Sequence, residues 1–224
     1  RATFHGWARD IVNAAVEDLG IARDHVRYLA ERPEEDPEIA QGRSTVENIG
    51  ASLAAMAENA GASDRVLVLL IGHGTGEGEE VEFNLPGPDL TPRALDEMLE
   101  VFPTQTLAVV NTAPSSGPFV PVLSGPNRVI LTATRTAQER NETRFGAYFA
   151  QALSGGETAD LDKDGRVSLL EVFEYVTGEV DRYYEEQNLL ATEHAQLDDD
   201  GDGTGSTDPG ENSEDGWLAR TFWL

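Results

Sequence analysis

Apolar side chains recur along the chain with two different spacings, one typical of helices and one typical of buried strands. Helical spacing predicts helices over residues 4–19, 45–59, 91–101, 143–153 and 169–187. Thr45 and Thr91 stand where a helix N-cap is expected, because a threonine hydroxyl can accept a hydrogen bond from a free backbone N–H. Pro92 suits the first helical position, and Gly20 and Gly61 read as helix stops.

Continuous apolar runs predict strands that are buried on both faces. These runs cover residues 66–71, 106–110 and 128–134, and a shorter strand is expected at 25–29. Residues 30–43 and 75–90 are rich in glycine, proline and acids, so they are expected to be loops. Strands that alternate with helices predict an α/β protein with a mostly parallel central sheet covered by helices on both sides. Ligands of such sheets bind beyond the carboxyl ends of the strands.

Residues 160–171 match a twelve-residue calcium loop of the EF-hand type. The six ligand positions are filled by Asp160, Asp162, Asp164, the carbonyl of Arg166, Ser168 and Glu171. Gly165 stands at the sharp turn. Calcium is a hard cation that takes about six to eight oxygen ligands, which gives the spacing a physical reason. The competing interpretation is a solvated acidic loop, and the match at every position favours Ca²⁺.

A second acidic stretch repeats the first half of this pattern. Asp198, Asp200 and Asp202 precede Gly203, but the twelfth position is Pro209, which has no side-chain ligand. A looser second metal site and a flexible acidic loop both remain open. We divide the chain into an α/β core (1–159), the calcium loop with its following helix in the same domain (160–197), and an acidic, glycine-rich segment with an apolar tail that docks on the body (198–224).

The amino-acid composition excludes several classes of partner and of chemistry. The chain has 41 acidic and 16 basic residues and a net charge of −25, which argues against nucleic acid, whose phosphates would be repelled. No apolar run has transmembrane length, so membrane insertion is not expected. The absence of cysteine excludes disulfides, thiolate metal sites and a cysteine nucleophile. Calcium loops of modest affinity work where calcium is abundant, which favours an extracytoplasmic or secreted location.

Several segments together resemble the caspase–legumain superfamily of cysteine peptidases, and most closely its bacterial legumain-like, peptidase C13-type members. One is a Gly-His-Gly after an apolar strand, and another is a small-residue loop that closes in Ser-Gly after the next strand. The similarity covers roughly residues 4–205 in segment order. The segments that carry it are 70–74, 83–89, 111–119, 132–134, 139–145, the calcium loop, 193–194 and 198–203.

The resemblance implies roles for the residues at the two strand ends. His73 falls on the catalytic histidine, and Gly74 on the oxyanion-hole region. Alignment of Ser116-Gly117 with the Ser-Gly of the family places Pro114 at the cysteine position. Proline has neither a nucleophilic atom nor a backbone N–H for the oxyanion. The segment 132–143 corresponds to a wall of the substrate pocket.

The resemblance also implies a caspase–hemoglobinase-like three-layer sandwich and a bacterial source. That fold begins with a central strand before the first helix, whereas this chain enters a helix at about Phe4. An empty central position would expose two sheet edges, which is costly. We therefore expect a missing or separately held N-terminal segment that completes the sheet.

Three functional hypotheses follow. The first is a calcium-binding, catalytically degenerate domain that binds or scaffolds a peptide or protein partner. The second is a calcium-dependent peptidase in which Ser115 or Ser116 is the nucleophile and His73 the base. Ser115 lies one residue beyond the expected position, and a turn chosen for backbone freedom is the simpler interpretation of Ser115-Ser116-Gly117. The third is an inactive, engineered variant of a peptidase.

Overall fold

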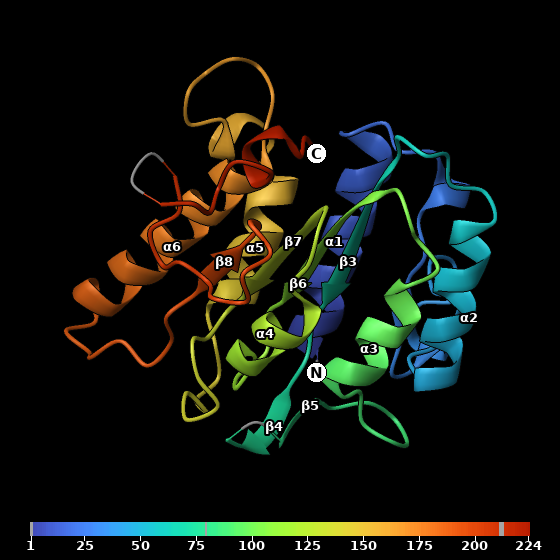
Figure 1. Ribbon diagram of the computed structural model, residues 1–224, viewed down its shortest axis with the longest axis horizontal. Helices are drawn as coiled ribbons and strands as arrows, with labels where there is room; N and C mark the ends of the chain where they lie inside the picture. The colour runs from blue at the N-terminus through green and yellow to red at the C-terminus, as the bar shows by residue number, and fades with distance from the viewer. Residues whose placement is uncertain (1, 79, 211–212) are drawn as a thin grey trace.

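A computed structural model describes residues 2–78, 80–210 and 213–224 and shows a mixed α/β protein with a mostly parallel sheet, as predicted (Figure 1). The α-helices are α1 (Ala2–Glu17), α2 (Val46–Ala57), α3 (Pro92–Leu99), α4 (Val120–Leu123), α5 (Phe145–Ser154) and α6 (Leu169–Glu186). The strands are β1 (Leu29–Ala30), β2 (Gly42–Arg43), β3 (Arg65–Leu70), β4 (Gly74–Glu77), β5 (Glu80–Phe83), β6 (Thr106–Asn111), β7 (Arg128–Thr132) and β8 (Gln196–Asp198). Among the described residues, no helix is long and apolar enough to span a membrane.

The main sheet has the strand order β3-β6-β7-β8. The strands β3, β6 and β7 run parallel, and β8 pairs with β7 in the antiparallel direction. Leu70 pairs with Asn111 and Asn111 with Thr132, so three strands end at the same edge. The loops that follow them therefore meet at one side of the molecule, where parallel sheets place their ligands.

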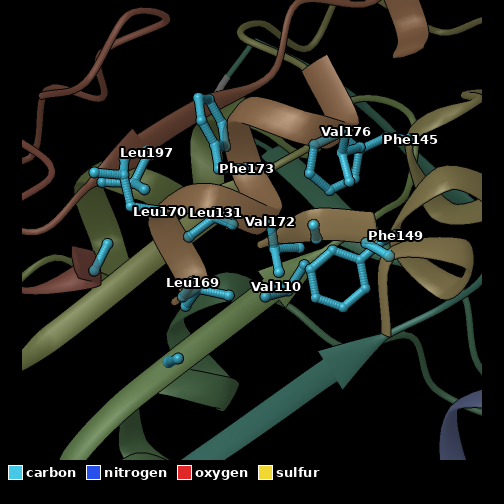
Figure 2. Close-up of a cluster of buried hydrophobic side chains, with 14 of the residues drawn as sticks. Val110, Leu131, Phe145, Phe149, Leu169, Leu170, Val172, Phe173, Val176 and Leu197 are labelled. Carbon is cyan, nitrogen blue, oxygen red and sulfur yellow. The ribbon is translucent and has the colours of Figure 1, made fainter. Parts of the chain in front are cut away.

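Alternate residues of β6 and β7 enter two separate apolar clusters. Ala108 and Val110 join a cluster with α5 and α6, whereas Leu107 and Val109 join one with α2, α3 and α4. Figure 2 shows the first cluster, in which Val110 and Leu131 lie against Phe149 and side chains of α6. Because both faces are covered, the strand sequences read as continuous apolar runs.

Two helix caps form where the sequence predicts them, and a third comes from a residue far away in the sequence. The hydroxyl oxygens of Thr45 and Thr91 accept hydrogen bonds from the third residue of α2 and α3. Helix α5 begins without a capping side chain of its own. The buried carboxylate of Glu193 accepts hydrogen bonds from the N–H groups of Arg144 and Phe145 instead. Burial raises the pKa of Glu193, although these hydrogen bonds oppose the shift.

Three expectations about local structure are wrong. Residues 75–90 contain a hairpin of β4 and β5 rather than only loop, with Gly76 at a φ of 145° that other residues rarely adopt. The strand expected at 25–29 is a 3₁₀ turn at Arg23–His25 followed by the two-residue β1, which pairs with β2. The boundary at residue 198 falls inside β8, so the acidic segment begins within the sheet.

The apolar tail docks on the body as expected. Phe222 is buried, and its carbonyl accepts a hydrogen bond from the N–H of Leu169 at the start of α6. The N–H of Leu224 donates to the carbonyl of Val167, which lies in the calcium-type loop. The tail therefore fixes the end of that loop, although Trp217 remains 62% exposed.

Candidate functional site

The loop of residues 160–171 brings three carboxylates together. Oxygens of Asp160, Asp162 and Asp164 lie within 4.8 Å of one another. The loop is folded by its own aspartates: Asp160 accepts hydrogen bonds from the N–H groups of Asp164 and Gly165, at 3.1 and 3.0 Å. Gly165 has a φ of 85°, the left-handed conformation that the sharp turn requires. This loop holds three oxygen donors at spacings suited to a metal ion.

Ser168 and Glu171 lie at the other end of the loop and form a capping box for α6. The Ser168 hydroxyl donates to Glu171, and the Glu171 carboxylate also accepts from the N–H groups of Leu161 and Asp162. Burial alone would raise the pKa of Glu171, but these hydrogen bonds outweigh it and hold the pKa below its ordinary value. Glu171 ties the two ends of the loop together and lies outside the group of three aspartates.

Arg166 makes one contact within the loop and one with the C-terminal tail, and neither uses the carbonyl that the calcium pattern assigns to it. Its N–H donates to Asp164 at 2.8 Å, and its guanidinium lies over the ring of Trp223, 5.6 Å from the centroid. The C-terminal tail and the loop are therefore in direct contact.

The acidic stretch that begins in β8 forms a second group. Oxygens of Asp198, Asp200 and Asp202 lie within 4.8 Å of one another, and Asp198 is fully buried. The Ser124 hydroxyl donates to Asp198 and accepts from the N–H of Gly203. Burial raises the pKa of Asp198, and the charges of Asp200 and Asp202 add to the shift. This group is better anchored to the body than its sequence indicates.

Asp215 is the residue that sequence reasoning missed. It is 4% exposed, and its carboxylate accepts a hydrogen bond from the N–H of Asp199 at 2.9 Å. Burial, followed by the charges of Asp200, Asp198 and Asp199, raises its pKa to about 6, although the hydrogen bond from Asp199 opposes this. Asp215 lies 16 residues after Asp199 in the sequence, so no spacing rule would have found it.

The two strand ends that carry the peptidase resemblance are adjacent. Gly74 follows β3, and a Cβ added there would lie 2.3 Å from the carbonyl oxygen of Pro114. The backbone at Gly74 thus packs against the loop after β6, which only glycine permits. The His73 side chain is exposed, and its ring meets the edge of Phe4 in α1 at a centroid distance of 4.9 Å.

The two serines of this loop point elsewhere. Ser115 and Ser116 are 2% and 1% exposed. The Ser115 hydroxyl donates to the carbonyl of Ala137, and the Ser116 hydroxyl pairs with that of Thr134. No hydrogen bond joins either hydroxyl to His73 among the interactions of the described residues. Ser115 also has a φ of 58°, so its conformation serves the turn.

No protein-family model matches this chain, and a comparison with curated proteins found no match.

The raised pKa of Asp215 predicts how the metal-free protein responds to pH. A carboxyl whose pKa rises on folding stabilises the fold below its unfolded pKa, and this stability is lost as the pH rises through the folded value of about 6. In chelator, wild-type melting temperature should fall from about pH 4 to pH 7, and Asp215→Asn should flatten the fall. Asn keeps an acceptor for the N–H of Asp199. A variant that melts lower than wild type at pH 7 in chelator would contradict this account.

Proposed function

We propose that this chain is a calcium-binding domain with a caspase/legumain-like, three-layer fold and a degenerate catalytic centre, and that it acts by binding or scaffolding. The observation that carries the proposal is the 160–171 loop, in which three aspartates at calcium-loop spacing converge within 4.8 Å. Six positions of the loop offer oxygen donors, and none offers sulfur or nitrogen.

The charge of the loop favours a divalent cation. Two carboxylates about 5 Å apart repel each other by roughly 1 kcal/mol in water and by more where water is excluded. The chain already carries a net charge of −25, and Lys163 is the one lysine in it. Calcium takes several carboxylates and carbonyls at once, whereas magnesium keeps most of its water, so the donor set favours calcium.

The second acidic group supports a second calcium site. Asp198, Asp200 and Asp202 repeat the spacing of the first loop. The twelfth position is Pro209, but the carboxylate of Asp215 accepts from the N–H of Asp199 and lies near enough for the charges of Asp198 and Asp200 to raise its pKa. Several buried or half-buried carboxylates without a cation are unfavourable, and a bound ion would neutralise them. We place Ca²⁺ at both groups.

The loss of catalysis is supported by the strand-end geometry. Pro114 fills the position that the resemblance assigns to the nucleophile, and it offers no N–H to an oxyanion. A serine nucleophile needs a base within hydrogen-bond reach. Ser115 and Ser116 are instead buried, with their hydroxyls bonded to Ala137 and Thr134. The serine-peptidase alternative thus has no observation in its favour.

The open edge of β3 supports a binding role. This strand ends the sheet on the side away from β6. Its central residues Leu67, Val68 and Leu69 are only partly buried, and they pack against the clusters on the two faces. An extended segment added there would pair with free backbone groups and bury apolar side chains on both faces. We propose that an apolar strand, such as the expected N-terminal segment, completes the sheet at this edge.

Calcium should raise the melting temperature through two sites, and a different variant should remove the contribution of each site. A ligand that binds the folded state alone adds about 2.7 kcal/mol at about a hundredfold excess over its dissociation constant. Asp162→Asn should abolish one step and Asp200→Asn the other, with little change in chelator. Asp181→Asn, an exposed acid of α6, is the control. A melting temperature that calcium does not change would refute the proposal.

Glu171 is unsuited to that test, because it also closes the loop and caps α6. We expect Glu171→Ala to lower the stability of the chelated protein as well, by about 1 kcal/mol or more. Comparison of its melting temperatures in calcium and in chelator separates the two roles.

Peptide hydrolysis should be undetectable in calcium. A fluorogenic peptide library should show no turnover above the level of His73→Ala, and a fluorophosphonate probe should label neither serine, because both hydroxyls are buried. Turnover that disappears in His73→Ala, or labelling that disappears in Ser115→Ala or Ser116→Ala, would reverse the assignment to a serine peptidase.

A synthetic apolar strand should bind the β3 edge through its backbone. We expect a labelled six-residue valine- and leucine-rich peptide to bind, and to slow amide exchange at Leu67–Leu69. The same peptide with alternate amides N-methylated lacks the donors and should bind at least about tenfold more weakly. Equal binding of the two peptides would show that strand addition does not occur.

A further inference from the structure

A groove of about 450 Å³ lies beyond the carboxyl ends of β6 and β7, apart from both His73 and the β3 edge. One wall is the turn into α4, with Pro118 and Pro121, and another is the loop after β7 from Arg135 to Gln138. Gln196 and the stretch 203–205 close it. The volume is in the range of about 300–1,000 Å³ that is typical of ligand sites.

The walls of the groove are held in place without a ligand. Gly117 packs so closely on the loop after β7 that an added Cβ would lie 2.1 Å from the carbonyl of Arg135. The amide of Gln196 donates to the carbonyl of Gly117, and the N–H of Gly203 donates to Ser124. The groove is therefore preformed, which lowers the entropic cost of binding.

Arg135 is the one charged residue that lines this groove within the described part of the chain. It is exposed. Among the arginines that the structure describes, all except Arg43 and Arg135 have a guanidinium bonded to a carboxylate or carbonyl, or placed over an aromatic ring. The Glu139 carboxylate accepts a hydrogen bond from the backbone N–H of Arg135, so the unpaired guanidinium is left to form charge-assisted hydrogen bonds with an anionic group.

We infer that this groove binds the carboxyl terminus of a protein or peptide partner, with the terminal carboxylate on Arg135 and an apolar last side chain against Pro118 and Pro121. The net charge of −25 repels acidic proteins and attracts basic ones. Every polypeptide ends in a carboxylate, so even a basic partner that has no acidic side chain carries one anionic group. The exposed Gln138 also lines the groove, and its amide could bond the backbone of the same residues.

This inference specifies which chemical group of the partner is recognised. It rests on the binding role proposed above and does not depend on calcium. A failure of this inference can be told apart from a failure of the proposed function. Calcium binding is measured by the melting temperature, and strand addition is measured by amide exchange at β3. A partner held by the β3 edge alone would bind regardless of its terminal carboxylate.

Fluorescence anisotropy with a basic pentapeptide that ends in leucine tests the inference. The free-acid peptide should bind, and its C-terminal amide should bind at least about tenfold more weakly, since a charge-assisted hydrogen bond is lost. Arg135→Gln should weaken the free acid to the same extent and leave the amide unchanged. Arg43→Gln is the matched control, because Arg43 is the other unpaired arginine and lies outside the groove.

Three results would overturn the inference. The first is that the free-acid peptide does not bind, and the second is that the acid and the amide bind equally well. The third is that Arg43→Gln weakens binding of the free acid as much as Arg135→Gln does. An amidated peptide with an aspartate side chain as its only carboxylate is a further arm. If it binds as well as the free acid, the groove reads a side-chain carboxylate and not a chain end.

Discussion

The arrangement of this molecule depends on the burial of β6 and β7 on both faces. Their alternate side chains enter two apolar clusters, so no polar side chain fits along most of their length. Polar chemistry is confined to the strand ends and to the segments wrapped around the sheet. His73, the 111–117 loop and the groove at Arg135 lie at or next to this sheet edge, whereas the second acidic group leaves β8 toward the opposite end of β7, beside Ser124.

The negative charge acts as a second constraint. Where three aspartates of one loop converge, their backbone N–H groups offset only part of the repulsion. Asp198 and Asp215 are held in surroundings that raise their pKa values, so the metal-free fold keeps costly carboxylates in place. A cation removes this cost. This links the acidic composition to the proposed function more directly than the strand-end histidine does.

At the strand ends, the loops after β3, β6 and β7 pack closely on one another. Gly74 touches the loop after β6, which requires the absence of a side chain at that position. Ser115 and Ser116 hold that loop to the one after β7 through Ala137 and Thr134. The same hydrogen bonds stabilise one wall of the groove at Arg135. Ser115 and Ser116 therefore have a structural role that does not depend on catalysis.

Local signals determined much of this protein. Threonine caps, apolar runs and the twelve-residue acidic pattern predict α2, α3, β3, β6, β7 and the first loop, because each depends on residues within a few positions of one another. The hairpin at β4 and β5 was missed because its glycines and acids lack the apolar alternation of a buried strand. The tertiary structure alone decided that Asp215 accepts a hydrogen bond from the N–H of Asp199, that Glu193 caps α5 from 48 residues away, and that Glu139 bonds the backbone N–H of Arg135 and leaves its guanidinium unpaired among the described residues. These contacts join residues that are far apart in the sequence and meet only when the chain folds. The spacing of residues along the sequence therefore does not predict them.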